Sequence, residues 1–334
     1  MRAGYSVRRT PALFFYAKLR AMKKLLVIVG PTGTGKSDLA LELANEFNGE
    51  LVSADSRQLY IGMDIGTGKE TEESGYKITE KRKGSWIVND VPIHLYDVIS
   101  PDKTFSVASY QQLAYKAIEQ IERRNKLPIL VGGTGLYVRA VTEGLKIPKA
   151  APDQKLRNRL ESRSLSTLVD ELKKVDPDTA AGIDTANPRR VVRALEVFYT
   201  SGRPLSKLKA KFEVHFNCLK IGLRADRDYL YKKVDAQVEK WFEQGFADEV
   251  KNLIVAGYTE DLSSMTSLGY RQVAMYLKKK LPLQEAKQRI KWEQHGYIRR
   301  QLTWFKKDSN VYWFDIAKAD FRKQIYDLIG KWRV

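Results

Sequence analysis

The first residues that could do chemistry lie close to the N-terminus, in the segment Gly30-Pro-Thr-Gly-Thr-Gly-Lys36-Ser37. The segment matches G-x-x-x-x-G-K-[ST], a pattern that cradles phosphate groups where it joins a buried strand to a helix. Glycines let the backbone wrap closely around an anion, and the N-terminus of the following helix adds its positive end. Lys36 supplies a positive charge, and the Ser37 hydroxyl can coordinate Mg²⁺. The pattern predicts a di- or triphosphate site, held by Gly30, Thr32, Gly33, Thr34, Gly35, Lys36 and Ser37.

The elements around this loop have the form that the pattern requires. The unbroken apolar run Leu25–Val29 precedes it and is typical of a strand buried on both faces of a parallel sheet. The stretch Ser37–Phe47 follows it, with apolar residues at helical spacing. An enzyme that transfers phosphoryl groups also needs an apolar strand ending in Asp to hold the metal. The candidate Ile129–Val131 ends in Gly132 instead, so Asp97 is the possible substitute.

Short apolar runs alternate with helical stretches along most of the chain. This alternation predicts an α/β fold, a P-loop NTPase-like parallel sheet flanked by helices. The other expected strands are 50–53, 93–98, 129–131, 219–223 and 311–314, and the expected helices include 107–123, 229–256 and 282–307. From 146 to 210 the sequence is polar, charged and helix-rich, which predicts an all-helical insertion domain. We therefore expect the α/β core in two parts, 22–145 and 211–334, around an insertion at 146–210.

Composition narrows the class of protein. The chain has 334 residues, of which 43% are hydrophobic, so general disorder is excluded. Its net charge of +18 favours a polyanionic partner. No apolar run approaches the ~20 residues of a membrane-spanning helix, so we expect no membrane association. The single cysteine, Cys218, excludes an intrachain disulfide and a Cys-rich zinc site, and a cytoplasmic location fits.

The N-terminal residues 1–21 are basic and contain no acidic residue. This composition resembles a transit peptide. The sequence Met22-Lys23-Lys24 opens the first expected strand, however, which favours a disordered or mis-annotated extension ahead of it.

Short segments, in their order along the chain, give the sequence a family likeness. The segments are Gly30–Ser37, Asp55–Lys69, Val91–Asp97, Phe105–Ala108, Leu130–Tyr137, Asp176–Ala181, Asn187–Glu196, Ser267–Arg271 and Arg300–Phe305. Together they resemble tRNA dimethylallyltransferases (isopentenyl-diphosphate:tRNA isopentenyltransferases) of the bacterial type, over nearly the whole chain from residue 22. Ile93 stands where the family usually has a His, and residues 70–90 are longer than usual and have no assignment.

The resemblance implies a reaction and roles for particular residues. The family moves a dimethylallyl group from dimethylallyl diphosphate to N6 of the adenosine at tRNA position 37, beside the anticodon. It implies that Asp55 is the general base, that Thr134 positions the reacting groups, and that Arg227 reaches the diphosphate, with Mg²⁺ on Ser37. From the residues alone, Asp55 and Thr134 could equally cap helices, and Arg227 could pair with a neighbouring Asp.

A basic surface with interleaved aromatic residues suits an RNA loop whose bases are splayed out. The stretch 290–307 has this composition, and three arginines cluster in 189–193. We expect a monomer that binds the tRNA anticodon stem-loop. The residues implied to contact tRNA are Asp55, Ser56, Arg57, Gln58, Arg157, Arg189, Arg190, Arg193, Tyr270, Arg271, Arg299, Arg300, Gln301 and Trp304.

Three other functions are compatible with parts of the sequence. A P-loop kinase of a nucleotide or small acceptor explains Gly30–Ser37, but leaves the basic helices unexplained. A prenyltransferase acting on free AMP or ATP would not require the insertion. A non-catalytic RNA-binding protein would have no use for a diphosphate cradle.

Overall fold

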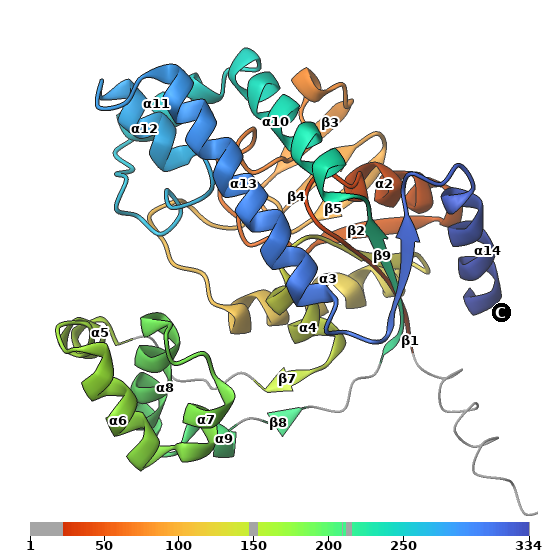
Figure 1. Ribbon diagram of the computed structural model, residues 1–334. Coiled ribbons are helices and arrows are strands. Elements are labelled where there is room, and N and C mark those ends of the chain that lie inside the picture. Colours follow the sequence, from red (N-terminus) through yellow and green to blue (C-terminus); the bar gives the residue numbers. More distant parts are fainter. Residues whose placement is uncertain (1–22, 147–152, 209, 212–215, 334) are drawn as a thin grey trace, which may run out of the picture. The chain divides into compact units, whose positions relative to one another are not determined.

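The structure is a computed structural model that describes residues 23–146, 153–208, 210–211 and 216–333 (Figure 1). The extension expected at residues 1–21 lies outside the described residues. The chain divides into two compact units. The first contains the described residues of 1–106, 112–138 and 215–334, and the second those of 107–111 and 139–214. The insertion expected at 146–210 belongs to the second unit, and its contact with tRNA stays a prediction.

The first unit is built on an eight-stranded sheet with the order β10-β9-β1-β6-β2-β5-β4-β3. Neighbours from β10 to β5 pair in parallel, whereas β5, β4 and β3 pair antiparallel. The expected α/β fold with a mostly parallel sheet is thus confirmed. The strands are β1 (Lys23–Val29), β2 (Gly49–Ser53), β3 (Ile78–Arg82), β4 (Ser85–Val88), β5 (Val91–His94), β6 (Leu127–Val131), β9 (Phe216–Arg224) and β10 (Val311–Asp315).

The centre of the sheet is held by apolar packing on both faces of β1. Its residues Leu25–Val29 are all buried, as the unbroken apolar run predicts. Leu26 and Ile28 share a core cluster with α2 (Lys36–Phe47) and α14 (Phe321–Arg333). Burying these side chains fixes β1 and places the loop that follows it at the edge where the parallel strands end.

The remaining helices of the chain's α/β part are α3 (Val107–Arg123), α4 (Gly135–Thr142), α10 (Arg227–Glu243), α11 (Phe246–Val255), α12 (Tyr270–Leu277) and α13 (Leu283–Phe305), with a short 3-10 turn at Glu72–Ser74. Phe246, Tyr270 and Ile290 are central to a second core that α10 to α13 share. Figure 1 shows these four helices gathered beyond the arrowhead of β9, with α10 beside α13.

The structure differs from the expected elements at three places. The single helix expected at 229–256 is two helices, because Gly245 between them has φ 93°. The strand expected at 93–98 ends at His94, because Leu95 and Asp97 adopt left-handed backbone angles. The unassigned segment 70–90 contains β3 and β4, a hairpin that extends the sheet antiparallel.

The second unit is mostly helical and has a core of its own. Side chains of Asp153, Ser164, Asp176 and Asn187 cap successive helices by accepting backbone N–H bonds. A two-stranded ribbon, which sequence periodicity did not reveal, joins residues on either side of the helices. The elements are β7 (Leu145–Lys146), α5 (Gln154–Glu161), α6 (Leu165–Val175), α7 (Pro177–Gly182), α8 (Pro188–Ser201), α9 (Leu205–Leu208) and β8 (Ala210–Lys211). None of the helices in the described part of the chain is both long enough and apolar enough to span a bilayer.

Candidate active site

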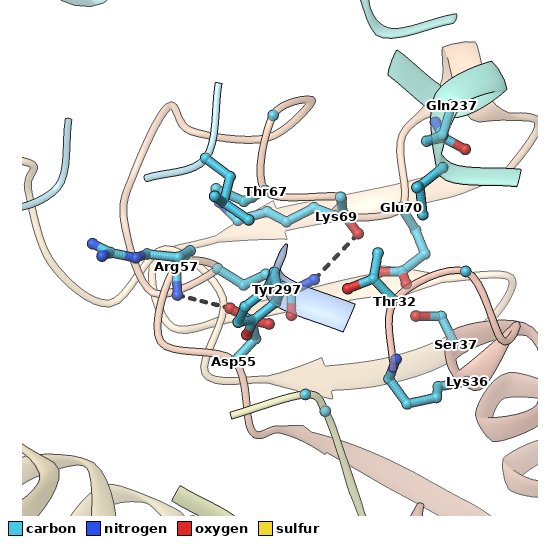
Figure 2. Close-up of a pocket in the computed structure, with 18 of the residues that line it drawn as sticks. Thr32, Lys36, Ser37, Asp55, Arg57, Thr67, Lys69, Glu70, Gln237 and Tyr297 are labelled. Atoms are coloured by element: carbon cyan, nitrogen blue, oxygen red, sulfur yellow. Dashed lines mark hydrogen bonds between the residues drawn. The ribbon is translucent and has the colours of Figure 1, made fainter. Parts of the chain in front are cut away.

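Three loops meet where neighbouring parallel strands end. The P-loop Gly30–Lys36 follows β1, Ala54–Arg57 follows β2, and Gly132–Thr134 follows β6. In open α/β sheets, ligands bind in the crevice outside these strand ends. Here the three loops line one cavity of about 1120 Å³, whose remaining wall includes residues of α10 and α13. Figure 2 shows Lys36, Ser37, Asp55 and Tyr297 around this cavity.

The P-loop has the backbone that its glycines allow. Gly33 and Gly35 have φ angles of 87° and 75°, which residues with a Cβ rarely adopt. A Cβ at Gly30 would lie 2.5 Å from the carbonyl oxygen of Leu223, so β9 approaches too closely for any other residue. The Lys36 ammonium donates to the carbonyl of Pro31 at 2.9 Å. Burial lowers the pKa of Lys36 to about 8, against the opposing effect of the Asp55 charge.

Asp55 lies just beyond the end of β2 and is half-buried in the cavity wall. One of its carboxylate oxygens accepts the backbone N–H of Arg57 at 2.8 Å. Burial raises the pKa of Asp55, although that hydrogen bond and the positive charge of Lys36 act in the opposite direction. A half-buried carboxylate with a raised pKa, facing a cavity, is well suited to accept a proton.

Thr134 connects the second and third loops. Its hydroxyl oxygen accepts the backbone N–H of Ser56 at 3.1 Å, and its own N–H donates to Ala54 at 3.1 Å. Tyr297 of α13 also hydrogen-bonds to Thr134. Thr134 therefore holds the loop that carries Asp55. It directly precedes α4, and its carbonyl oxygen accepts the backbone N–H of Val138 at 3.1 Å.

Glu70 is a carboxylate in this cavity that the sequence reading missed. It is 3% exposed, and Tyr96 donates its hydroxyl to it at 2.5 Å. Glu70 also hydrogen-bonds to Ser37, beside which Figure 2 shows it. Burial raises the pKa of Glu70. Its position directly after the family-like segment Asp55–Lys69 is the only sequence signal for it.

The donor set around Ser37 fits a magnesium ion. A hydroxyl and a carboxylate are hard oxygen ligands of the kind that Mg²⁺ prefers. No group of three or more His, Cys, Asp or Glu side chains in the described part of the chain could hold a metal by itself. An ion at Ser37 and Glu70 would therefore need further oxygens from a bound phosphate group, as is usual for Mg²⁺.

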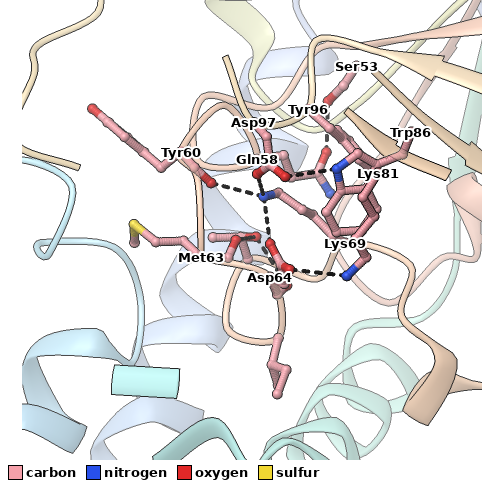
Figure 3. Close-up of polar contacts among 12 residues, drawn as sticks. Ser53, Gln58, Tyr60, Met63, Asp64, Lys69, Lys81, Trp86, Tyr96 and Asp97 are labelled. Carbon is pink, nitrogen blue, oxygen red and sulfur yellow. Dashed lines mark hydrogen bonds and ion pairs between the residues drawn. The ribbon is translucent and has the colours of Figure 1, made fainter. Parts of the chain in front are cut away.

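Asp97, the expected substitute for a metal-holding aspartate, has a different partner. It forms an ion pair with the buried Lys69 at 2.5 Å and accepts the indole N–H of Trp86 at 2.8 Å (Figure 3). Lys69 also contacts Asp64 at 2.8 Å and the carbonyl of Tyr60 at 2.9 Å. These contacts hold the 55–69 loop, and Asp97 does not line the cavity, so the structure gives no support to Asp97 as the possible substitute for a metal-holding aspartate.

Arg227 lines a second cavity of about 640 Å³ and is absent from the residues around the first. Arg224, Arg299 and Lys306 line the same second cavity, which makes it strongly basic. Contact between Arg227 and a diphosphate stays a prediction.

The residues expected to bind tRNA fall into two groups in the first unit. Tyr270 is completely buried and donates its hydroxyl to Glu249 at 2.6 Å, so it has a core role in place of the expected RNA contact. Gln301 is also buried, and it joins two loops: its carbonyl oxygen accepts the Thr32 N–H at 2.8 Å and its amide donates to Gly133 at 3.2 Å. Gln301 nevertheless lines the first cavity. The other expected residues that line this cavity or are exposed are Asp55, Ser56, Arg57, Gln58, Arg271, Arg299, Arg300 and Trp304.

In the second unit, the four expected arginines also differ from one another. Arg189 and Arg190 are exposed in the first turn of α8. Arg157 and Arg193 both contact the fully buried carboxylate of Glu196, at 2.7 and 2.6 Å. The second pair is thus engaged in the packing of this unit.

Comparison with known proteins gives a consistent result. A family model described as IPP transferase matches residues 58–308. A tRNA dimethylallyltransferase of Thermomicrobium roseum is 43% identical over 92% of this chain and 91% of its own length. One of Dehalococcoides mccartyi is also 43% identical, over 88% of each chain.

Two solved structures are similar over most of the chain. The full-length tRNA isopentenylpyrophosphate transferase of Bacillus halodurans is 39% identical, with a TM-score of 0.66, and the match covers 93% of this chain and 96% of that one. A eukaryotic dimethylallyltransferase, described as acting on tRNA, is 25% identical with a TM-score of 0.74 over 92% of this chain and 78% of that one.

Proposed function

This chain belongs to the IPP transferase family, and from that premise we propose that its P-loop cavity transfers a dimethylallyl group from dimethylallyl diphosphate to N6 of adenosine 37 in a tRNA anticodon loop. Transfer of a dimethylallyl group to tRNA is the activity for which its relatives are named, and it is the activity of this chain. The donor, the acceptor atom and the position in tRNA are the proposed parts.

One observation carries the proposal: a phosphate cradle and a half-buried carboxylate face the same cavity. Lys36 and Asp55 both line this cavity, and the positive charge of Lys36 acts against the rise that burial causes in the pKa of Asp55. A binding site for diphosphate alone would not need such a carboxylate. An alkyl transfer needs both, because it must stabilise a leaving pyrophosphate and remove a proton from the nucleophile.

The P-loop would act on the leaving group. Its backbone N–H groups and Lys36 are placed where negative charge grows as the bond between the dimethylallyl carbon and the diphosphate oxygen breaks. Mg²⁺, when bound with Ser37 and Glu70, would supply a further positive charge to the diphosphate.

Asp55 would act on the nucleophile. The adenine N6 lone pair is delocalised into the ring, so the amine attacks poorly until its proton begins to leave. As N6 bonds to the dimethylallyl carbon, its proton passes to the Asp55 carboxylate and pyrophosphate departs with the electrons of the broken C–O bond. Arg57 and Thr134 hold the Asp55 loop for this step. The target base would leave its stack to enter the cavity.

A transfer assay tests the proposal. Purified protein is incubated with Mg²⁺, labelled dimethylallyl diphosphate and unmodified tRNA, with free AMP and ATP as parallel acceptors. We expect label at N6 of adenosine 37 and none in the free nucleotides. Asp55→Asn keeps the shape of the side chain but removes the base, and should lower kcat by about 10²–10⁴-fold.

Asp102→Asn is the matched control, because Asp102 is an exposed carboxylate outside the cavity. It should leave the rate unchanged. Label in AMP or ATP alone would show that the protein is a prenyltransferase of free nucleotides. ATP hydrolysis without any labelled product would support the kinase function instead.

A further inference from the structure

Glu249 of α11 is a carboxylate behind the cavity wall that accepts backbone N–H groups from three successive residues of one loop. Its Oε2 accepts the N–H of Asp64 at 2.9 Å and that of Ile65 at 2.7 Å. Its Oε1 accepts the N–H of Gly66 at 3.4 Å and the Tyr270 hydroxyl at 2.6 Å. An ionised carboxylate has only acceptors, so the four donors together fix its orientation. Glu249 itself does not line the cavity.

The loop that Glu249 holds continues into the wall of the first cavity. Residues 65–70 all line that cavity. Behind them, Gly66 packs so closely against α11 that a Cβ on it would lie 2.3 Å from the Phe246 ring. Phe246 and Glu249 are three positions apart and so share one face of the helix. The wall is thus fixed from behind by one apolar contact and one set of hydrogen bonds.

The same wall touches the loop that carries Asp55. The Gln58 amide donates to the carbonyl of Gly68 at 3.2 Å, and its Oε1 accepts the Ser53 hydroxyl at 2.7 Å. The backbone N–H of Asp55 donates to that hydroxyl oxygen at 3.3 Å. The four donors to the α11 carboxylate, in contrast, all lie outside the P-loop. A shift of the wall would therefore reach the Asp55 loop and leave the diphosphate cradle in place.

Resting on the proposed function, we propose that Glu249 is a positioning residue for the transfer: by fixing the wall at residues 64–68, it aligns the Asp55 carboxylate with the reacting atoms without touching either substrate. Alignment acts on the rate of the bound complex. Its loss therefore lowers kcat more than it raises KM.

Steady-state kinetics of two uncharged variants test this role. Glu249→Gln keeps one oxygen for the backbone N–H groups and an amide that can donate to the Tyr270 hydroxyl. Glu249→Met has a similar size but offers only a weakly accepting sulfur. With labelled dimethylallyl diphosphate and unmodified tRNA, kcat of Glu249→Met should fall about 10- to 100-fold, while KM for dimethylallyl diphosphate changes less than about threefold. Glu249→Gln should keep kcat within about threefold of the wild type.

A variant in the wall itself gives an independent test. Gly66→Ala leaves Glu249 intact but places a methyl group against the Phe246 ring, so it displaces the same wall. We expect a similar fall in kcat with little change in KM, and this variant tests the role even if Glu249→Met does not fold. In the double variant, the two effects on log kcat should be less than additive, because both disturb one wall.

Glu50→Gln separates alignment from stability. Glu50 is another buried carboxylate with several donors, but it does not line the cavity. Urea titrations give the stability of each variant, and the rates are measured where all variants are folded. Glu50→Gln should be less stable than the wild type and keep its kcat.

Four results would overturn the assignment. An equal loss of kcat in Glu50→Gln would make general destabilisation the cause, and an equal loss in Glu249→Gln would make the charge the cause. A raised KM with unchanged kcat would mean that the wall binds the donor. Unchanged kinetics in Glu249→Met and Gly66→Ala would mean that its position is unimportant. Labelled product from the wild type leaves the proposed function intact in each case, whereas its absence would count against that function.

Discussion

Lys36 and Lys69 are two lysines at the same edge of the sheet, and their surroundings give them opposite uses. Lys36 contacts a backbone carbonyl, so its charge remains available to an incoming anion. Lys69 has a completely buried side chain that contacts the carboxylates of Asp64 and Asp97. A buried cation with two close carboxylates stabilises the loop to which it belongs, here the one that begins at Asp55.

Removing Lys69 should therefore destabilise the protein. Lys69→Met leaves two carboxylates without their common cation, and we expect the free energy of unfolding in urea to fall by about 3–5 kcal/mol. Lys81→Met is the comparison, because Lys81 pairs with the same Asp64 at 3.5 Å but is 47% exposed. Its loss should cost less than about 1 kcal/mol. Equal effects of the two variants would contradict the buried-pair interpretation.

At the scale of elements, α13 aligns the loops of the active site. Gln301 joins the P-loop to the loop after β6, and α13 packs so closely there that a Cβ at Gly135 would lie 2.0 Å from the Trp304 ring. The same helix carries the exposed Arg299 and Arg300. One helix thus contacts the P-loop and also carries basic residues, of which Arg300 lines the first cavity and Arg299 the second.

Gln301 should act on donor binding through this contact. Gln301→Met removes the acceptor of the Thr32 N–H, so the P-loop is less ordered before the substrate binds. Part of the binding free energy of dimethylallyl diphosphate is then needed to order the loop. We expect KM for dimethylallyl diphosphate to rise about 5- to 30-fold, with kcat and the Kd for RNA changed less than about twofold. Gln324→Met, an exposed glutamine of α14, serves as control. Weaker RNA binding with an unchanged KM for dimethylallyl diphosphate would instead support the contact between Gln301 and tRNA that was expected from the sequence.

A second element-scale contact joins β2 to its neighbours. The buried Glu50 of β2 bonds to His94 at 2.7 Å, Arg124 at 2.6 Å and Lys126 at 3.2 Å. Burial alone would raise its pKa, but the bonds to these three partners outweigh burial and lower the pKa to about 2.

Because the folded-state pKa of Glu50 is below the unfolded value, its contribution is present above about pH 4.5 and is lost as the pH falls toward 2. Glu50→Gln should therefore lower the free energy of unfolding by about 2–3 kcal/mol at pH 7. The difference from the wild type should shrink at pH 3. Urea titrations at both pH values measure it, and a pH-independent difference would argue against the ionic contribution.

At the scale of the whole molecule, the charge of +18 is unevenly committed. Arg157 and Arg193 are paired with Glu196 inside the second unit, whereas Arg189 and Arg190 are exposed. Only a cationic side chain without an internal ion pair can bind an RNA phosphate and release the counterions around it.

This difference predicts separate effects on RNA binding. For a side chain that contacts one phosphate, the slope of log Kd for RNA against log salt concentration should be smaller than in the wild type by about 0.7–0.9 in Arg189→Gln or Arg190→Gln. Arg157→Gln should instead lower the thermal stability, since it leaves part of the buried Glu196 charge unpaired, and leave the slope unchanged. A reduced slope for Arg157→Gln would show that its pairing yields to RNA.

The sequence by itself determined the features that depend on residues close together in the chain. The P-loop with its flanking β1 and α2 follows from one apolar run, three glycines and one helical repeat. The α3 helix has the bounds that its periodicity predicts. The order of short segments indicated the family over nearly the whole chain, because several of the segments are specific by themselves and their order can be read without knowing their spatial neighbours.

Only the tertiary structure decided which polar residues face the cavity and which are used within the protein. Asp97 and Glu70 are both acidic, yet Asp97 pairs with Lys69 while Glu70 lies beside Ser37. Tyr270 and Gln301 lie in family-like segments but are buried with internal partners. The burial of a side chain and its polar partners depend on residues that are tens to hundreds of positions away, so a local sequence pattern cannot predict them.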